Sequence, residues 1–498
     1  MQAHDRLPET SGFRRGEGQK RLRMLQPRQD TTSADTAILG SATVGTETAT
    51  RLPPRPEVRA VPLDPMVREG ADRDRPATFL FLQGIASPFF SDLGRALRAR
   101  GHGVRRINFC SGDWLFWGGG SDHYRGPRTG WEAYLDAYVA EHGVTDIVLF
   151  GDCRPFHVVA REVAAREGLR VHVFEEGYVR PNWITCELGG VNGYSSLPRT
   201  AEAVLALARR LPQPARALPS SGDMARRSLW DVSYNLANVL FPYLYPRFRS
   251  HRPTHIAMEY AGWIKKFARR GRTRREAAHC DEIYRAVGCD YFLLPLQLDS
   301  DYQIRVHSPF LGVEGFMDRV IKSFAETSKA PTRLLVKLHP LDSGLMNWRR
   351  FARASARRHG VSDRLDFIDG GDLPALIAGA RGVVIVNSTV GMLSLEMGRP
   401  THAVGTAIYN MAGLTHQGDL DSFWTEPTAP DMDLVADFRR VVLNRTQVNG
   451  GFFSQEAIAR AVAGSVPRMD SAMPDATLAA ARAIRERAEE DGRLAPVY

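Results

Sequence analysis

The sequence predicts an α/β fold with two doubly wound domains that face each other across a cleft. Short apolar runs ending in glycine or polar residues alternate with helical patterns, first over residues 76–200 and again over 286–430. Such alternation is typical of a parallel sheet with helices on both faces. The segment between these two series, residues 201–285, is helical, aromatic and basic, and we interpret it as an insertion.

The first domain begins near Thr78 with an apolar run and a glycine turn. The apolar residues of 89–97 fall at helical spacing, so we expect a helix directly after the first strand. The strands expected in this domain are 78–84, 101–109, 145–152 and 169–177.

The second domain repeats this alternation. Its expected strands are 289–299, 333–340, 364–369, 382–391 and 400–405. Two Rossmann-like domains that face a common cleft form the GT-B architecture of many nucleotide-sugar transferases, although other α/β enzymes share this outline.

The two ends of the chain do not follow this pattern. Residues 1–75 are rich in Arg, Thr, Ser, Pro and Gly without a sustained apolar period, and we expect them to be disordered. Residues 431–498 are expected to form a C-terminal helical tail.

The composition indicates a cytoplasmic globular protein. Hydrophobic residues make up 43% of the 498 residues, and no apolar run is long enough to predict a transmembrane helix. The five cysteines lack paired or metal-like spacing, which favours reduced thiols. The net charge of +9 is compatible with binding to nucleic acid, to an anionic membrane or to an anionic substrate. The distribution of the charge along the chain must decide among these three partners.

Polar residues that follow the predicted strands are the candidates for chemistry, because ligands of doubly wound sheets bind beyond the carboxyl ends of the strands. RLLVKLHP ends in His339 and Pro340. A histidine here can donate a hydrogen bond to a phosphate, and the proline fixes the turn that directs it. The alternative is a surface histidine before a turn.

GVVIVNSTVG predicts a second phosphate-binding element. Ser388 and Thr389 open a helix, where hydroxyls, backbone N–H groups and the helix dipole favour an anion. Glu396, two turns along this helix, could accept hydrogen bonds from a ribose. The alternatives are a simple helix cap and a solvated glutamate.

LPLQLDSDYQ opens the second domain and places polar side chains at a strand end. We expect Gln297, Asp299 and Gln303 to contact the substrate. Asp299 and Asp301 could also be read as a metal-binding pair, which we disfavour, or as helix caps.

VHVFEEGY ends a first-domain strand with Glu175 and Glu176. One carboxylate raises the pKa of another nearby, and one of the two acids could deprotonate an acceptor or attack an anomeric carbon. Two surface acids on a turn are the alternative. In the preceding strand, GDCRPFH supplies Asp152 and Arg154; the latter could orient a carboxylate or pair with Asp152.

The insertion carries the features of a membrane-binding segment. AGWIKKFARRGRTRR places Lys265, Lys266, Arg269 and Arg270 next to Trp263, and the aromatic segment 235–252 precedes it. Basic residues beside aromatic ones bind anionic membrane surfaces. We find no nucleic-acid-binding module, and a solvated helix face is the alternative.

Taken together, these stretches resemble the KpsS-type capsule polysaccharide synthesis proteins. The resemblance extends in order over about residues 78–430, through FLQG, RINFCSGDWLFW, DIVLFGDCRPFH, VFEEGYVRPNWIT, GVNGYSSLP, PLQLDSDYQ, KLHP and NSTVG. It implies a retaining β-Kdo transferase with the GT-B fold, which uses CMP-Kdo as its donor and no metal or other cofactor. The implied acceptor is a phosphatidylglycerol-type lipid.

The resemblance also implies roles for particular residues. Its acid-acid-glycine motif falls on Glu175 and Glu176, its HP motif on His339 and Pro340, and its hydroxyl pair on Ser388 and Thr389. The match does not decide between the glutamates, and we favour Glu176 as catalytic.

The same resemblance implies a location and partners. The protein is expected to be peripheral on the inner face of the inner membrane, beside other capsule assembly proteins. Two alternatives stay open: a non-catalytic capsule assembly or export factor, and a transferase that uses CMP-sialic acid.

Overall fold

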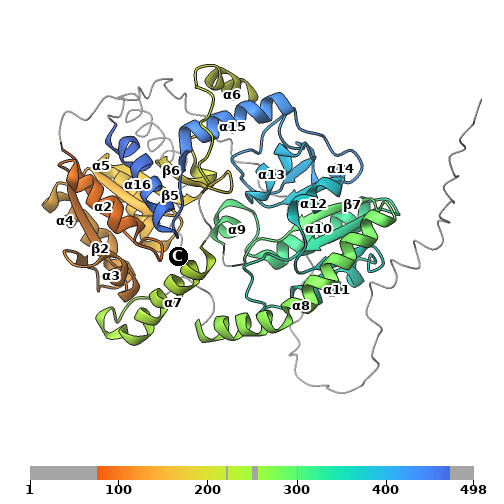
Figure 1. Cartoon of the computed structure of the whole chain (residues 1–498), viewed down its shortest axis with the longest axis horizontal. Coiled ribbons are helices and arrows are strands. Elements are labelled where there is room, and N and C mark those ends of the chain that lie inside the picture. The colour runs from red at the N-terminus through yellow and green to blue at the C-terminus, as the bar shows by residue number, and fades with distance from the viewer. Residues whose placement is uncertain (1–75, 220–222, 250–255, 300, 472–498) are drawn as a thin grey trace, which may run out of the picture.

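Two α/β domains lie side by side in the computed structural model, the first at the left and the second at the right of Figure 1. The structure describes residues 76–219, 223–249, 256–299 and 301–471. The expected disordered segment 1–75 and the end of the expected tail, 472–498, lie outside these ranges.

The first domain is built on a seven-stranded sheet in the order β12-β6-β5-β4-β1-β2-β3, in which strands β1 to β5 are parallel. Its elements up to residue 194 are β1 (Thr78–Phe81), α2 (Phe89–Ala99), β2 (Gly103–Asn108), α3 (Ser111–Trp117), β3 (Asp122–His123), η1 (Arg128–Gly130), α4 (Trp131–His142), β4 (Asp146–Phe150), α5 (Pro155–Glu167), β5 (Arg170–Glu176), β6 (Trp183–Leu188) and η2 (Asn192–Tyr194).

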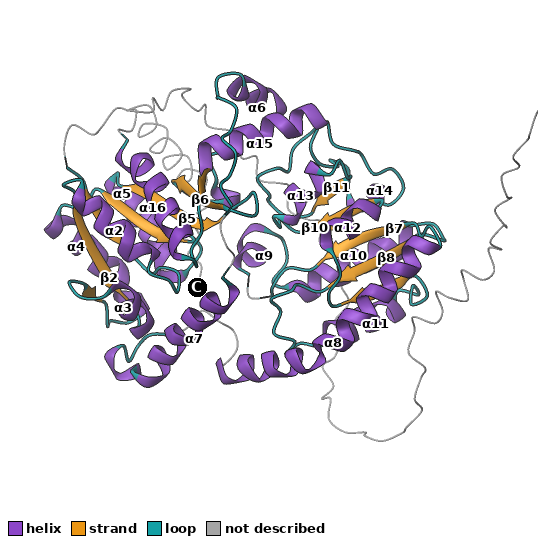
Figure 2. Cartoon of the chain, viewed as in Figure 1, coloured by secondary structure: helices purple, strands orange, loops and turns teal. Residues whose placement is uncertain are grey.

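The central strands of this sheet are buried on both faces. Residues 79–82 and 147–149 are fully buried or nearly so, and Figure 2 shows helices on either side of the strands. A strand buried on both faces reads as a continuous apolar run, which is why the sequence predicted these strands. The predicted fold class is therefore confirmed for this domain.

The second domain has a five-stranded, fully parallel sheet in the order β11-β10-β7-β8-β9. Its elements are β7 (Tyr291–Pro295), α9 (Tyr302–His307), α10 (Val313–Thr327), β8 (Arg333–Lys337), α11 (Trp348–Arg358), β9 (Leu365–Ile368), α12 (Leu373–Gly379), β10 (Gly382–Ile385), α13 (Val390–Glu396), β11 (Thr401–Ala403) and α14 (Leu420–Phe423). All five of its strands were expected from the sequence.

The C-terminal segment differs from the helical tail that we expected after residue 431. Helix α15 (Met432–Thr446) packs against both α13 and α6, and the chain then enters the first domain. There β12 (Gln447–Asn449) pairs antiparallel with β6, and α16 (Gln455–Asp470) packs against α2. The segment therefore completes the first domain.

The helices of the expected insertion are shared between the domains. Helix α6 (Ala201–Ala208) packs on α15, α7 (Met224–Leu240) with η3 (Pro242–Leu244) packs on α3, and α8 (Ile256–Ala286) packs on β9. Residues 201–286 are thus a crossover whose α7 belongs to the first domain and whose α8 belongs to the second (Figure 1).

Candidate functional site

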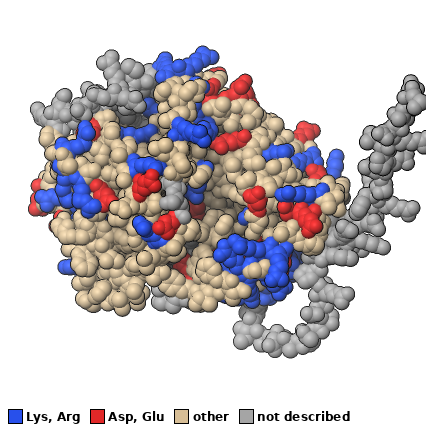
Figure 3. All heavy atoms as spheres, viewed as in Figure 1, with Lys and Arg blue, Asp and Glu red and all other residues tan. Residues whose placement is uncertain are grey.

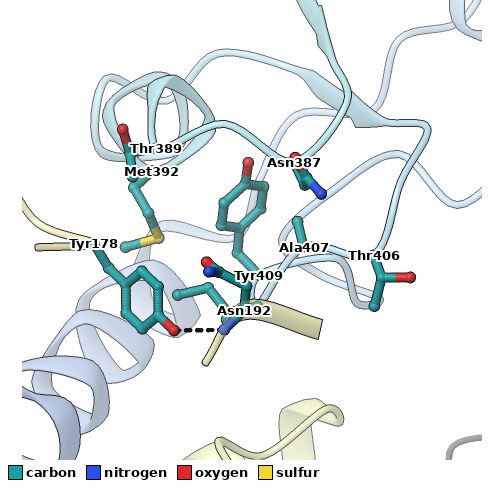
Figure 4. A pocket seen from close by; sticks show the side chains of 9 residues that line it. Tyr178, Asn192, Asn387, Thr389, Met392, Thr406, Ala407 and Tyr409 are labelled. Atoms are coloured by element: carbon teal, nitrogen blue, oxygen red, sulfur yellow. Dashed lines mark hydrogen bonds between the residues drawn. The ribbon is translucent and has the colours of Figure 1, made fainter. Parts of the chain in front are cut away.

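A pocket between the domains is lined by residues that follow strands of both sheets. Tyr178 and Asn192 come from the first domain; the second domain contributes Asn387, Thr389, Met392, Thr406, Ala407, Ile408 and Tyr409. Figure 4 shows these side chains around the pocket. The Asn192 backbone N–H donates to the Tyr178 hydroxyl at 2.7 Å, which fixes the first-domain wall. The candidate site therefore lies at the carboxyl edges of both sheets.

The turn after β5 requires a glycine. A Cβ atom on Gly177 would lie 2.3 Å from the carbonyl oxygen of Trp183, at the start of β6. Any other residue would push the two strands apart, so Gly177 allows β6 to return directly alongside β5. This close return holds Glu175 and Glu176 at the end of the sheet.

Glu175 faces the pocket side of β5. Its carboxylate accepts a hydrogen bond from the Asn192 side chain, and Asn192 itself lines the pocket. Burial, together with the negative charges of Asp152 and Asp301, raises the pKa of Glu175 to about 8. Glu175 is therefore mainly protonated at neutral pH.

Glu176 points to the opposite face of the strand, as adjacent strand residues do. Its Oε1 atom lies 3.4 Å from the Nη1 atom of Arg227 on α7. The same oxygen is buried, and no described residue donates a hydrogen bond to it. A buried carboxylate oxygen with unused acceptor capacity is suited to a group supplied by a substrate.

His339 follows β8 in the second domain, and its ring is neutral. The Leu341 backbone N–H donates to His339 Nδ1 at 3.0 Å, so the ring proton resides on Nε2. Burial and the positive charges of Lys337, Arg180, Lys266 and Arg227 lower the pKa of His339 to about 4. Two of these cations, Arg180 and Arg227, belong to the first domain, so the histidine shares a field of positive charge with Glu176.

Lys266 does not have the exposed position that we expected for a membrane-binding residue. Its side chain is only 16% exposed and reaches 3.9 Å from Asp369. Its Nζ atom donates to the carbonyl oxygens of Pro340 at 2.9 Å and Asp342 at 2.7 Å. Lys266 therefore holds the loop that carries His339. The other predicted membrane-binding cations, Lys265, Arg269 and Arg270, are exposed, and Trp263 is half-buried.

Ser388 and Thr389, which we expected to act together as a phosphate-binding pair, make different contacts. The Ser388 hydroxyl accepts from the Val390 N–H at 3.2 Å, which is a local turn contact. Thr389 precedes α13, its side chain makes no capping bond, and it lines the pocket.

Glu396 does not line this pocket. Its Oε1 atom accepts from Arg439 Nε at 3.0 Å, so it joins α13 to α15.

The polar residues after β7 are mostly structural. Gln297 bonds the Asn387 side chain at 3.1 Å and the Asn387 N–H at 3.2 Å, which orients a residue of the pocket. Asp299 accepts from the Val313 N–H at 3.0 Å and thus caps α10, which matches the helix-cap alternative and not the expected substrate contact. Gln303 lies in α9, and its side chain is outside the described part of the structure.

Asp152 and Arg154 hold loops of the first domain. Asp152 is 1% exposed and accepts from the Val191 N–H at 2.9 Å, next to the pocket residue Asn192. Arg154 donates to the Gly84 carbonyl at 3.0 Å. Neither residue lines the interdomain pocket.

Three buried side chains from the two domains meet beside this site. Ligand atoms of Asp152, Cys153 and His307 lie within 4.8 Å of one another. Cys153 Sγ is 3.2 Å from Asp152 Oδ1 and 3.5 Å from His307 Nε2, which are hydrogen-bond distances for sulfur. Burial lowers the pKa of His307 to about 4, so the histidine of this contact between the domains is neutral.

Several residues of the site had no predicted role. Arg180 and Arg227 supply charge around His339, and Tyr178, Asn192 and Asn387 line the pocket. EEGYVRPN and VNST lie at the carboxyl ends of predicted strands, and that position was the available signal for Tyr178, Arg180 and Asn387. GVNGY follows β6, which was not predicted, so Asn192 had no such signal. Arg227 had none, because it lies in the crossover far from both sheets in sequence.

The sheets, the return of the C-terminal segment and the interdomain pocket define a two-domain α/β protein with the GT-B arrangement. Residues 145–453 match the family model described as capsule polysaccharide biosynthesis protein. The chain belongs to this capsule polysaccharide biosynthesis family, and its resemblance to KpsS-type proteins is confirmed.

Two curated relatives cover most of the chain. The capsule polysaccharide modification protein LipB of Neisseria meningitidis serogroup B is 32% identical over 383 residues, which are 76% of this chain and 91% of LipB. The capsule polysaccharide export protein KpsS of Escherichia coli is 32% identical over 381 residues, 75% of this chain and 96% of KpsS.

Solved structures that cover about three quarters of the chain are more distant. KpsC of Thermosulfurimonas dismutans, a beta Kdo 2,7 transferase, is 13% identical with a TM-score of 0.38, covering 78% of this chain and 99% of KpsC. The lipopolysaccharide outer core galactosyltransferase WaaB is 9% identical with a TM-score of 0.31, covering 74% of this chain and 97% of WaaB.

Proposed function

We propose that this protein is a glycosyltransferase of capsule biosynthesis that transfers β-Kdo from CMP-Kdo to a phosphatidylglycerol-type lipid. The observation that carries the proposal is that one arginine of α7, Arg227, pairs with Glu176 of the first domain and also lowers the pKa of His339 of the second. Glu176 and His339 come from different sheets and share the positive charge of Arg227. Membership of the capsule polysaccharide biosynthesis family supports a substrate from that pathway.

The second domain is suited to a departing CMP. As the bond from the sugar to the phosphate breaks, negative charge grows on a phosphate oxygen. His339 Nε2–H can donate to that oxygen, and Arg180, Arg227 and Lys266 place positive charge around it. These groups can stabilise a monophosphate, so we propose that transfer needs no metal.

The two glutamates are suited to different tasks. Glu175, with a pKa of about 8, stays mainly neutral at pH 7, which removes the repulsion that two adjacent carboxylates would have. Glu176, which pairs with Arg227, then provides the reacting carboxylate. It can act on the anomeric carbon or accept the proton of the acceptor hydroxyl, and Glu176→Gln removes both capacities.

An assay of sugar transfer with the purified full-length chain tests the proposed function. We expect mass spectrometry to show a lipid product that carries Kdo after incubation with CMP-Kdo and phosphatidylglycerol. Glu176→Gln and His339→Ala should each lower the rate at least a hundredfold, or about 2.7 kcal/mol. Glu326→Gln, at an exposed pair with Lys322 on α10, is the matched control and should keep full activity.

Two other outcomes would replace the proposal. Product from CMP-sialic acid but not from CMP-Kdo would change the donor. Absence of both CMP release and product would favour a non-catalytic role, in line with the name export protein that the Escherichia coli relative carries.

A further inference from the structure

Helix α7 is attached to the first domain by polar side chains. The Tyr234 hydroxyl donates to Asp113 Oδ1 at 3.1 Å and accepts from Gln83 Nε2 at 3.0 Å. Asn238 accepts from the Gly112 N–H at 2.8 Å. Residues 227, 234 and 238 recur at helical spacing and mark the inner face of the helix.

The outer face of the same helix is apolar. Leu229, Val232, Leu236, Val239 and Leu240 follow the spacing i, i+3, i+7, i+10 and i+11, and we call them the α7 apolar face. These five side chains are 43–63% exposed. A surface helix in water normally buries its apolar stripe and exposes its polar one. Helix α7 has the opposite arrangement, with its polar face buried and its apolar face exposed. This arrangement indicates that its outer surface meets an apolar environment.

Neighbouring elements extend this surface. Helix α3 packs against α7 and exposes Trp114 by 45% and Leu115 by 48%, and Tyr243 of η3 is 69% exposed. Figure 3 shows few charged atoms over this lower left part of the molecule. An apolar surface of this extent marks an interaction site.

Cations flank the apolar surface on one side. Helix α8 lies with α7 along the lower edge of the molecule in Figure 1, and the blue cluster in Figure 3 lies over it. Its exposed basic residues are Lys265, Arg269, Arg270, Arg272, Arg274 and Arg275. Among them, Ile264 and Phe267 are 72% and 61% exposed. Apolar side chains beside a band of cations match the interface of a bilayer that contains anionic lipids.

We propose that the α7 apolar face, with the exposed residues of α3, inserts into an anionic phospholipid bilayer while the cations of α8 contact its headgroups. One part of this inference rests on the proposed function, namely that the bilayer supplies the lipid acceptor to the site. None of the described helices combines the length and apolar content needed to cross a bilayer, so the contact is one of helices lying in the interface.

The inner faces of the two helices connect this surface to the candidate site. Arg227 of α7 pairs with Glu176, and Lys266 of α8 holds the Pro340 carbonyl. Each helix thus contacts one half of the site from behind its membrane-facing side. Docking would bring the sides of the two domains that carry Glu176 and His339 toward the lipid surface, where an acceptor headgroup can enter without leaving the bilayer.

Vesicle flotation of the full-length chain tests this proposal without any donor. The vesicles are phosphatidylcholine with or without phosphatidylglycerol. Leu236→Glu places a charge on the α7 apolar face at a side chain that is 50% exposed; Met432→Glu on α15 is the matched control, at 47%. Leu236→Glu should lower binding to phosphatidylglycerol vesicles at least tenfold, and Met432→Glu should change it less than twofold. Both should keep the wild-type melting temperature.

Other outcomes would overturn the proposal. Flotation of Leu236→Glu at the wild-type level would show that the α7 apolar face does not insert. A wild-type dimer that Leu236→Glu converts to a monomer would assign the face to a second copy of the chain. If the wild-type chain transfers no Kdo but still floats with the vesicles in a way that depends on Leu236, the proposed function is rejected and the docking surface is retained.

Discussion

Glu175 and Glu176 are adjacent in sequence but occupy different environments, because successive strand residues face opposite sides. Glu175 contacts Asn192 at the interdomain pocket, whereas Glu176 contacts Arg227 on α7. The sequence predicted both acids and the histidine as candidates, because they lie at or just after the ends of apolar strands. It could not separate the roles of the two acids, because these depend on contacts from the segments 178–194 and 224–240.

The raised pKa of Glu175 predicts a stability cost that varies with pH. A carboxyl whose folded pKa is about 8, against an ordinary value near 4.5, binds more protons in the folded state, so its contribution to stability falls as the pH rises between these values. Glu175→Gln should therefore melt about 2–5 °C above the wild type at pH 8 and equally at pH 4. Equal melting temperatures at pH 8 would contradict the raised pKa.

The lowered pKa of His339 predicts donor binding that is insensitive to pH. With a pKa of about 4, the ring stays neutral above this value and donates from Nε2 throughout. Affinity for CMP-Kdo, measured by calorimetry, should stay constant within about twofold from about pH 5.5 to about pH 8. A tenfold gain in affinity on acidification over that range would show a histidine that becomes charged.

Lys265 and Lys266 are neighbours whose substitution should give different defects. Lys266→Met removes the hydrogen bonds to the Pro340 and Asp342 carbonyls and should weaken CMP-Kdo binding about tenfold by loosening the loop of His339. Lys265→Met should leave that affinity unchanged and weaken flotation with anionic vesicles. The same defect in both variants would exclude a positioning role for Lys266.

At the scale of elements, most of the strands that were predicted are buried on both faces, whereas β2 and β9 are only partly buried. β3, β6 and β12 were not predicted. β3 has two residues and β12 three, and β12 is defined only by its pairing with β6. β6 is antiparallel, and WITCEL lacks the continuous apolar run of the parallel strands. Helical periodicity also cannot tell which face of α7 is buried, so its inversion required the structure.

Helix α16 and the turn before it should be essential to the first domain. Phe452 is 2% exposed, and its ring lies 5.0 Å from that of Phe89 and 5.2 Å from that of Phe150. Phe452→Ala should lower the free energy of unfolding by about 3–5 kcal/mol, as measured in urea. Phe267→Ala, at a side chain that is 61% exposed, is the control and should change it by less than about 0.5 kcal/mol.

At the scale of the whole molecule, the two-domain outline follows from sequence periodicity, whereas the connections between the domains do not. Residues 201–285 were expected to form one insertion, yet α7 packs on one domain and α8 on the other. The C-terminal segment was expected to be a tail, yet it returns to the first sheet. Both differences concern long-range pairing, about which local sequence patterns carry no information.

The return of β12 and α16 to the first domain has a consequence for the order of synthesis. A ribosome releases the N-terminal half of this domain long before residues 447–470 emerge, whereas every strand of the second sheet lies within 291–403. The second domain can therefore finish folding first, while side chains that this C-terminal segment covers, such as Phe89 beneath Phe452, are still exposed to solvent. The part of the protein made first is the part completed last.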